Sequence, residues 1–107
     1  MKTLKFDPSL VPLVLDGSKT STWRLFDDKD LQVRDRLSLV NSVDRQEFAQ
    51  AEIVEVREKK LGEITEEDYE GHSRYESLEK MIESFRGHYG AGVTPETLVK
   101  IVRFKLV

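Results

Sequence analysis

Residues 17–24 read Gly-Ser-Lys-Thr-Ser-Thr-Trp-Arg, and the rest of the chain is interpreted outward from this stretch. Gly17 suits the left-handed conformation that ends a helix, so a turn follows it directly. Lys19 and Thr22 are three positions apart along the chain, so strict strand alternation would direct their side chains to opposite faces. We therefore expect Lys19 to lie on the turn, outside the regular strand, where it can share a face with Thr22.

The stretch continues into an alternating pattern that predicts a strand over residues 20–25. Thr20, Thr22 and Arg24 share one face, while Trp23 and Leu25 lie on the other and are expected in the core. The polar face either lines a wet cleft or is an ordinary exposed strand face in which threonine reflects β propensity.

On both sides of this strand the sequence predicts a mixture of short strands and helices. Asp7 to Ser9 form a turn, and Ser9 is expected to cap a helix over residues 10–16. Thr65 with Asp68, and Ser73 with Glu76, match capping boxes, so two helices are expected to begin there. The second helix carries an apolar face made of Tyr75, Leu78, Met81, Ile82 and Phe85.

The other strands are expected over residues 1–6, 36–40, 47–57 and 98–107, with those at 36–40 and 47–57 forming an antiparallel hairpin. This order predicts an α+β fold, a half-open β-barrel with short helices at its rim.

Length and composition limit the possible functions. The 107 residues fit a single domain, residues 1–107, and the absence of cysteine excludes disulfide frameworks and thiolate chemistry. We expect a cytoplasmic protein, because no signal peptide or transmembrane segment is recognisable. The 20 acidic and 17 basic residues give a net charge of −3, which argues against a protein that coats nucleic-acid backbones, and no DNA partner is expected.

Most catalytic and cofactor motifs are missing from the sequence. There is no phosphate-binding glycine loop, no histidine pair spaced for zinc and no glycine-flanked nucleophilic serine, so neither a metal nor a cofactor is expected. His72 and His88 are isolated, and both are interpreted as surface or helix-end residues.

The stretch Leu13 to Arg24 resembles the Gly-x-Lys-x-x-Thr-x-Arg signature of the ASCH domain, with Lys19, Thr22 and Arg24 at its defined positions. Further similarities follow in order at residues 33–39, at Glu70-Gly71 and at residues 99–104. Arg34 departs from the pattern, because the family usually has glycine before the aspartate that Asp35 matches.

The resemblance implies a barrel similar to the PUA fold, with a cleft where the signature residues meet, and a role in RNA binding linked to transcription or translation. It also implies an alternative, because a small bacterial branch of the family hydrolyses N4-acetylcytidine with a Lys, a Thr and a Glu. Those residues correspond to Lys19, Thr22 and Glu70. A lysine amine whose pKa is lowered by burial can act as general base beside a hydroxyl group, while a carboxylate transfers a proton.

Three functions therefore remain open on the sequence alone. The first is a binding module for RNA or a modified nucleoside, with Thr20, Arg24, Arg34 and Asp35 as further ligand-binding residues. The second is the amidohydrolase, and the third is a regulatory module that contacts another protein. Basic residues at the predicted cleft, Arg24, Arg34, Arg36, Lys100, Arg103 and Lys105, are expected to form a rim that holds phosphate.

Overall fold

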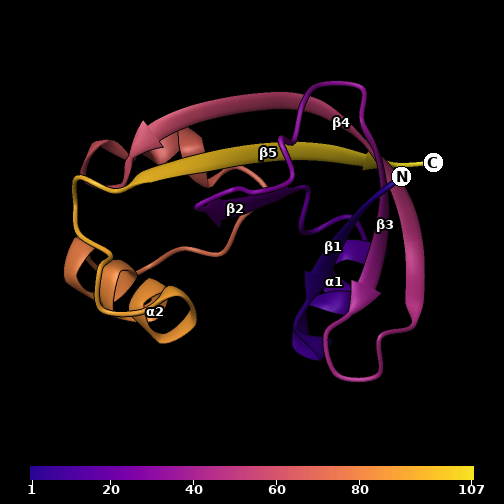
Figure 1. Ribbon diagram of the computed structural model, residues 1–107, viewed down its shortest axis with the longest axis horizontal. Helices are drawn as coiled ribbons and strands as arrows, with labels where there is room; N and C mark the ends of the chain where they lie inside the picture. The colour runs from indigo at the N-terminus through magenta and orange to yellow at the C-terminus, as the bar shows by residue number, and fades with distance from the viewer.

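The computed structural model describes residues 1–107 and contains one five-stranded sheet that curves into a half-barrel (Figure 1). The strands lie in the order β1-β3-β4-β5-β2. Their bounds are Lys2–Phe6 for β1, Ser21–Leu25 for β2, Arg36–Asn41 for β3, Glu47–Lys60 for β4 and Leu98–Leu106 for β5. The predicted α+β half-open barrel and all five predicted strands are thus confirmed.

Strand pairing leaves β1 and β2 as the two edges of the sheet. β1 runs parallel to β3, whereas β3–β4, β4–β5 and β5–β2 are antiparallel, which confirms the predicted hairpin. β4 is long enough to pair with β3 through its first half and with β5 along most of its length. A register shift between Ile53 and Glu55 bends it, as β-bulges do. This bend lets the sheet curve until its two edges approach each other (Figure 1).

The first helical segment lies in the predicted place but begins differently. A 3-10 turn covers Pro8–Leu10, and α1 covers Val11–Leu15. Asp7, not Ser9, provides the cap, since its carboxylate accepts a hydrogen bond from the Ser9 backbone N–H at 2.9 Å. Gly17 follows at φ 86°, which confirms its predicted left-handed conformation.

The Thr65–Asp68 capping box is present, on a 3-10 turn over Glu66–Tyr69 that follows another at Leu61–Glu63. The predicted helix start at Ser73 is wrong. α2 covers Leu78–Tyr89, and Ser77 caps it by accepting from the backbone N–H of Lys80 at 3.1 Å. Residues 72–76 instead form an irregular segment whose aromatic side chains pack beside β2.

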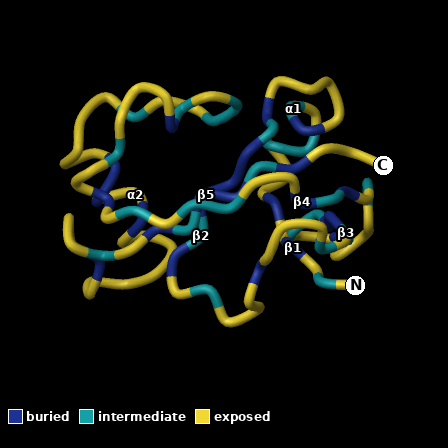
Figure 2. The backbone as a smooth tube through the Cα atoms, turned by 90° about the horizontal axis from the view of Figure 1, so that it is seen from above, coloured by how far each residue is buried: buried dark blue, intermediate teal, exposed yellow.

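Two apolar clusters form the core, and strand β5 contributes to both. The first contains ten buried residues from β1, α1, the loop before β3, and β3 to β5; the second contains nine from β2, β5 and α2 with its flanking segments. The buried backbone follows the sheet, and the exposed backbone lies mainly in turns and helix surfaces (Figure 2). None of the helices is both long and apolar enough to cross a membrane.

Candidate functional site

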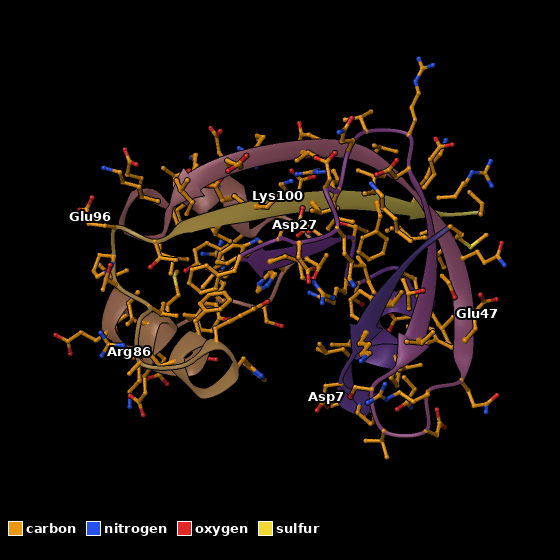
Figure 3. The ribbon with its side chains drawn as sticks, in the orientation of Figure 1. Asp7, Asp27, Glu47, Arg86, Glu96 and Lys100 are labelled. Atoms are coloured by element: carbon orange, nitrogen blue, oxygen red, sulfur yellow. The ribbon has the colours of Figure 1, made fainter.

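A cleft of about 430 Å³ lies where the two edges of the sheet approach each other, between the two halves of the core. Residues of β1 and the following turn form one wall, β2 with the turn before it forms the floor, and α2 with its preceding segment forms the other wall. Asp7, labelled in Figure 3, lies on the wall opposite α2. The lining residues are Lys5, Phe6, Asp7, Leu10, Lys19, Thr22, Trp23, Arg24, Ser42, His72, Tyr75, Phe85, His88 and Tyr89.

Lys19 occupies the turn between Gly17 and β2, outside the strand as predicted. Its backbone N–H donates to the Leu13 carbonyl at 2.9 Å, which holds the turn against the end of α1. The residue is only 8% exposed, and its ammonium group makes no hydrogen bond or ion pair. Burial, together with the nearby Arg24 cation, lowers the pKa of Lys19 from 10.5 to about 8.

Arg24 links the two edges of the sheet. Its Nη2 donates to the Lys5 carbonyl of β1 at 3.0 Å, and its Nε donates to Thr22 Oγ1 at 3.0 Å. The guanidinium lies 5.1 Å from the centre of the Phe6 ring, a cation–π distance. No carboxylate pairs with it, and burial lowers the pKa of Arg24. The residue therefore closes the opening of the half-barrel and leaves Nη1 without a protein partner.

Aromatic side chains form the wall next to Lys19. Trp23 is 4% exposed and stacks on His72 with ring centres 4.1 Å apart and an interplanar angle of 18°. Tyr75 lies 6.0 Å from Trp23 and 6.0 Å from Phe85, so the cluster connects β2 with α2. The interpretation of His72 as a surface residue is therefore wrong, and Trp23, expected only in the core, also lines the cleft.

The backbone at Gly71 fixes this aromatic wall to β2. Its carbonyl accepts from the N–H groups of Thr20 at 3.0 Å and Ser21 at 3.2 Å. Gly71 has φ 74°, and a Cβ there would lie 2.0 Å from Thr20 Oγ1. Only glycine allows so close an approach, and this contact sets the position of His72.

The predicted catalytic residues are brought together only in part. Lys19 and Thr22 both line the cleft, and Thr22 is 5% exposed. The side chain of Glu70 is 73% exposed, lies within 3.2 Å of Arg103 and does not line the cleft. The predicted grouping of Glu70 with Lys19 and Thr22 is therefore not found, because only the Glu70 backbone faces β2, where its carbonyl accepts from Ser21 Oγ.

Of the predicted ligand-binding residues, only Arg24 lines this cleft. Thr20 lines a separate cavity of about 330 Å³ on the other side of Lys19. Asp35 pairs with Lys2 at 2.7 Å and accepts from the Gln32 N–H, while Arg34 is exposed on the same turn at φ 77°. Both lie outside the cleft, because the turn before β3 is at a different end of the sheet.

The predicted basic rim is also absent. Lys100 pairs with Asp27 at 2.8 Å, and the two labelled side chains meet in Figure 3. Arg103 lies near Glu55 and Glu70, and Arg36 and Lys105 both lie near Glu52. These basic side chains pair with acids outside the cleft, so the buried positive charge of the site comes from Lys19 and Arg24, and the exposed Lys5 also lines the cleft. No group of three or more acidic or histidine side chains is arranged to hold a metal ion.

We expect His72 to remain uncharged well below the pH at which histidine usually titrates. Burial, and secondarily the Lys19 cation, lower the pKa of His72 from 6.5 to about 4. Folding stability should then fall as the pH drops from 6.5 toward 4, because the unfolded state binds the proton first. NMR titration of the imidazole should give a midpoint near 4 that rises in Lys19→Met. A midpoint near 6.5 would show that His72 does not pack on Trp23.

No family model matches the sequence, and no curated protein matches it. Solved structures do match the fold. A protein from Enterococcus faecalis V583, described under the family model DUF984, is 18% identical at a TM-score of 0.77, with 92% of this chain and 70% of that chain covered. The ASCH domain from Lactobacillus crispatus JV V101 is 20% identical at a TM-score of 0.71, with the same coverage. A mutant of the ZmASCH protein from Zymomonas mobilis is 11% identical at 0.69, with 96% and 66% covered. The chain therefore has the ASCH fold, a half-open α+β barrel of the PUA-like kind.

Proposed function

We propose that the cleft binds one nucleobase-bearing unit, either an unstacked base of a single-stranded RNA or a modified nucleoside. The observation that carries this proposal is the stacked Trp23–His72 pair beside the unpaired Lys19 cation. Proteins that recognise single-stranded RNA stack splayed bases on aromatic side chains and hydrogen-bond their edges.

The composition of the cleft supports a compact aromatic ligand. Its volume of about 430 Å³ falls within the usual range of small-molecule pockets, roughly 300 to 1,000 Å³. His72 and Tyr75 are the partly exposed members of the aromatic wall and offer stacking surfaces. Thr22 and Lys19 supply polar groups that can orient the base or ribose.

The distribution of charge argues against a long nucleic-acid track. Each contact with a backbone phosphate needs an unpaired lysine or arginine side chain. The cations on β3 and β5 instead pair with carboxylates. A ligand that contacts only Lys19 and Arg24 should show a weak salt dependence. For single strands we expect a slope of log K against log salt near −0.7, the contribution of one neutralised phosphate.

Calorimetric titration tests the proposal. The panel contains the four ribonucleosides, N4-acetylcytidine and a single-stranded hexaribonucleotide. We expect at least one of them to bind, and His72→Ala to weaken that binding about 5- to 150-fold, because stacking on one aromatic residue contributes about 1 to 3 kcal/mol. Val43→Ala, on the exposed turn between β3 and β4, should leave the affinity unchanged. Failure of every compound to bind, or equal binding by His72→Ala, would refute the proposal.

Hydrolysis of an acylated cytidine is the second candidate, and the lowered pKa of Lys19 favours it. With a pKa of about 8, part of the Lys19 population is neutral near pH 7 and can act as a general base beside the Thr22 hydroxyl. The carboxylate that lines the cleft is Asp7, not Glu70. Release of cytidine and acetate from N4-acetylcytidine, reduced about 100- to 10,000-fold in Lys19→Met, would establish the hydrolase. Binding of N4-acetylcytidine without release of cytidine would exclude the hydrolase and leave the binding function as the proposal.

A further inference from the structure

The pairing of cations in this protein singles out two residues. Seven lysine and arginine residues are buried or half-buried. Five of them pair with carboxylates and two, Lys19 and Arg24, pair with none. The paired residues are Lys2, Arg57, Lys59, Lys100 and Arg103. Both exceptions line the same cleft.

An unpaired buried cation is costly, because removal from water is not offset by a nearby negative charge. Lys19 is more than nine-tenths buried, and its ammonium group has no hydrogen-bond partner. Lys19 Nζ and Arg24 Nη1 have no hydrogen-bond partner, yet neither atom is fully buried. Both can therefore be reached from outside. These two groups are therefore donors that face accessible space.

No nearby acid forms an ion pair with Lys19 or Arg24. Asp7 lines the cleft, but its carboxylate accepts hydrogen bonds from the Ser9 N–H at 2.9 Å and the Ser9 Oγ at 2.6 Å. Asp27, beyond Arg24, is held by Lys100. Arg24 is itself fixed by Lys5, Thr22 and the Phe6 ring, so its free Nη1 is pre-oriented and loses little freedom when it binds.

We infer that Lys19 and Arg24 form an oxyanion subsite in the floor of the cleft, and that the unit bound there is phosphorylated, a nucleotide in place of a neutral nucleoside. This inference rests on the proposed function, since the aromatic wall that stacks the base identifies phosphate as the anion. Charge-assisted hydrogen bonds from lysine and arginine are the usual way to hold a phosphate oxygen. The phosphate can belong to a free mononucleotide or to the backbone of an RNA strand.

The experiment compares matched ligands by calorimetry at pH 7. Each ribonucleoside is titrated beside its 5′-monophosphate, and the dinucleoside monophosphates CpU and UpC, which have no terminal phosphate, represent the RNA backbone. We expect the phosphate to increase affinity about 10- to 150-fold in the parent protein, as a hydrogen bond to a charged group does. Lys19→Met should lower the ratio of monophosphate affinity to nucleoside affinity, whereas Lys80→Met, on the exposed surface of α2, should leave this ratio unchanged.

The results separate this inference from the function on which it rests. Nucleosides that bind as tightly as their monophosphates and dinucleoside monophosphates would overturn the oxyanion subsite and leave the proposed function intact. No binding by any compound would overturn both. A gain for the dinucleoside monophosphates alone would identify RNA as the source of the phosphate, and a gain for the mononucleotides alone would identify a free nucleotide.

The same preference should depend on pH. The charged and titratable groups that face Lys19 across the cleft are Lys5, Asp7, Arg24, His72, Tyr75, His88 and Tyr89. Arg24 stays charged in the neutral range, so loss of the proton from Lys19 should remove part of the phosphate preference as the pH rises above 8. A preference that is constant from pH 7 to pH 10 would assign the phosphate contact to Arg24 alone and exclude Lys19 from the subsite.

Discussion

Replacement of Lys19 by methionine should stabilise the protein at pH 7 by up to about 3 kcal/mol. Lowering the pKa of Lys19 from 10.5 to about 8 means that the folded state disfavours the charged ammonium by roughly this amount. Methionine is unbranched like lysine and fills similar space without carrying a charge. The gain should be measured as the change in free energy of unfolding in guanidinium chloride.

The size of this effect changes with pH in a defined way. Below pH 8 Lys19 is charged in both the folded and unfolded states, so the full free-energy cost of burying its charge is present. Between pH 8 and 10.5 the folded state releases its proton first, and the parent protein gains stability as the pH rises. The advantage of Lys19→Met should therefore shrink over this window. Lys80→Met, at an exposed site, should change stability by less than about 0.5 kcal/mol. A destabilised Lys19→Met variant would show that the ammonium has a partner.

Replacement of Gly71 by alanine should destabilise the protein by about 2 to 5 kcal/mol. The left-handed conformation at φ 74° costs a residue with a Cβ about 1 to 2 kcal/mol. The added Cβ would also lie 2.0 Å from Thr20 Oγ1 and 3.1 Å from the Thr20 backbone nitrogen, and relief of such overpacking typically costs about 1 to 3 kcal/mol. Chemical denaturation gives the loss directly.

Gly87 provides the matched control, because it lies within α2, lacks a positive φ and has no atoms within 4 Å of the position that a Cβ would occupy. Gly87→Ala should stabilise the protein by about 0.5 to 1 kcal/mol. A folded fraction of Gly71→Ala should also show the His72 midpoint moving from about 4 toward 6.5, since the segment would detach from β2. Stability of Gly71→Ala within about 0.5 kcal/mol of the parent, the range of an ordinary surface substitution, would contradict the role assigned to Gly71.

Local signals predicted the parts of the fold that local chemistry controls. The left-handed Gly17, the turn that carries Lys19, the Thr65–Asp68 capping box and the β3–β4 hairpin each depend on residues close together in the chain. The start of α2 was predicted too early, at Ser73 in place of Ser77. Residues 72–76 match a helix start locally, but packing of His72 and Tyr75 against Trp23 holds them outside the helix. Burial of aromatic side chains outweighs a single capping interaction.

Patterns in the sequence were enough to predict the α+β barrel and the presence of a lysine and a threonine at one turn-to-strand junction. Which buried cations lack a carboxylate partner depends on tertiary contacts. Seventeen basic residues face twenty acidic ones in the sequence, and pairs such as Lys100 with Asp27 form across 73 positions. Strand register and loop packing bring these charges together, whereas Lys19 and Arg24 lie at the gap between the two sheet edges and form no ion pair. Alternation along one strand cannot reveal such long-range pairing, because it specifies a face and not the partner opposite.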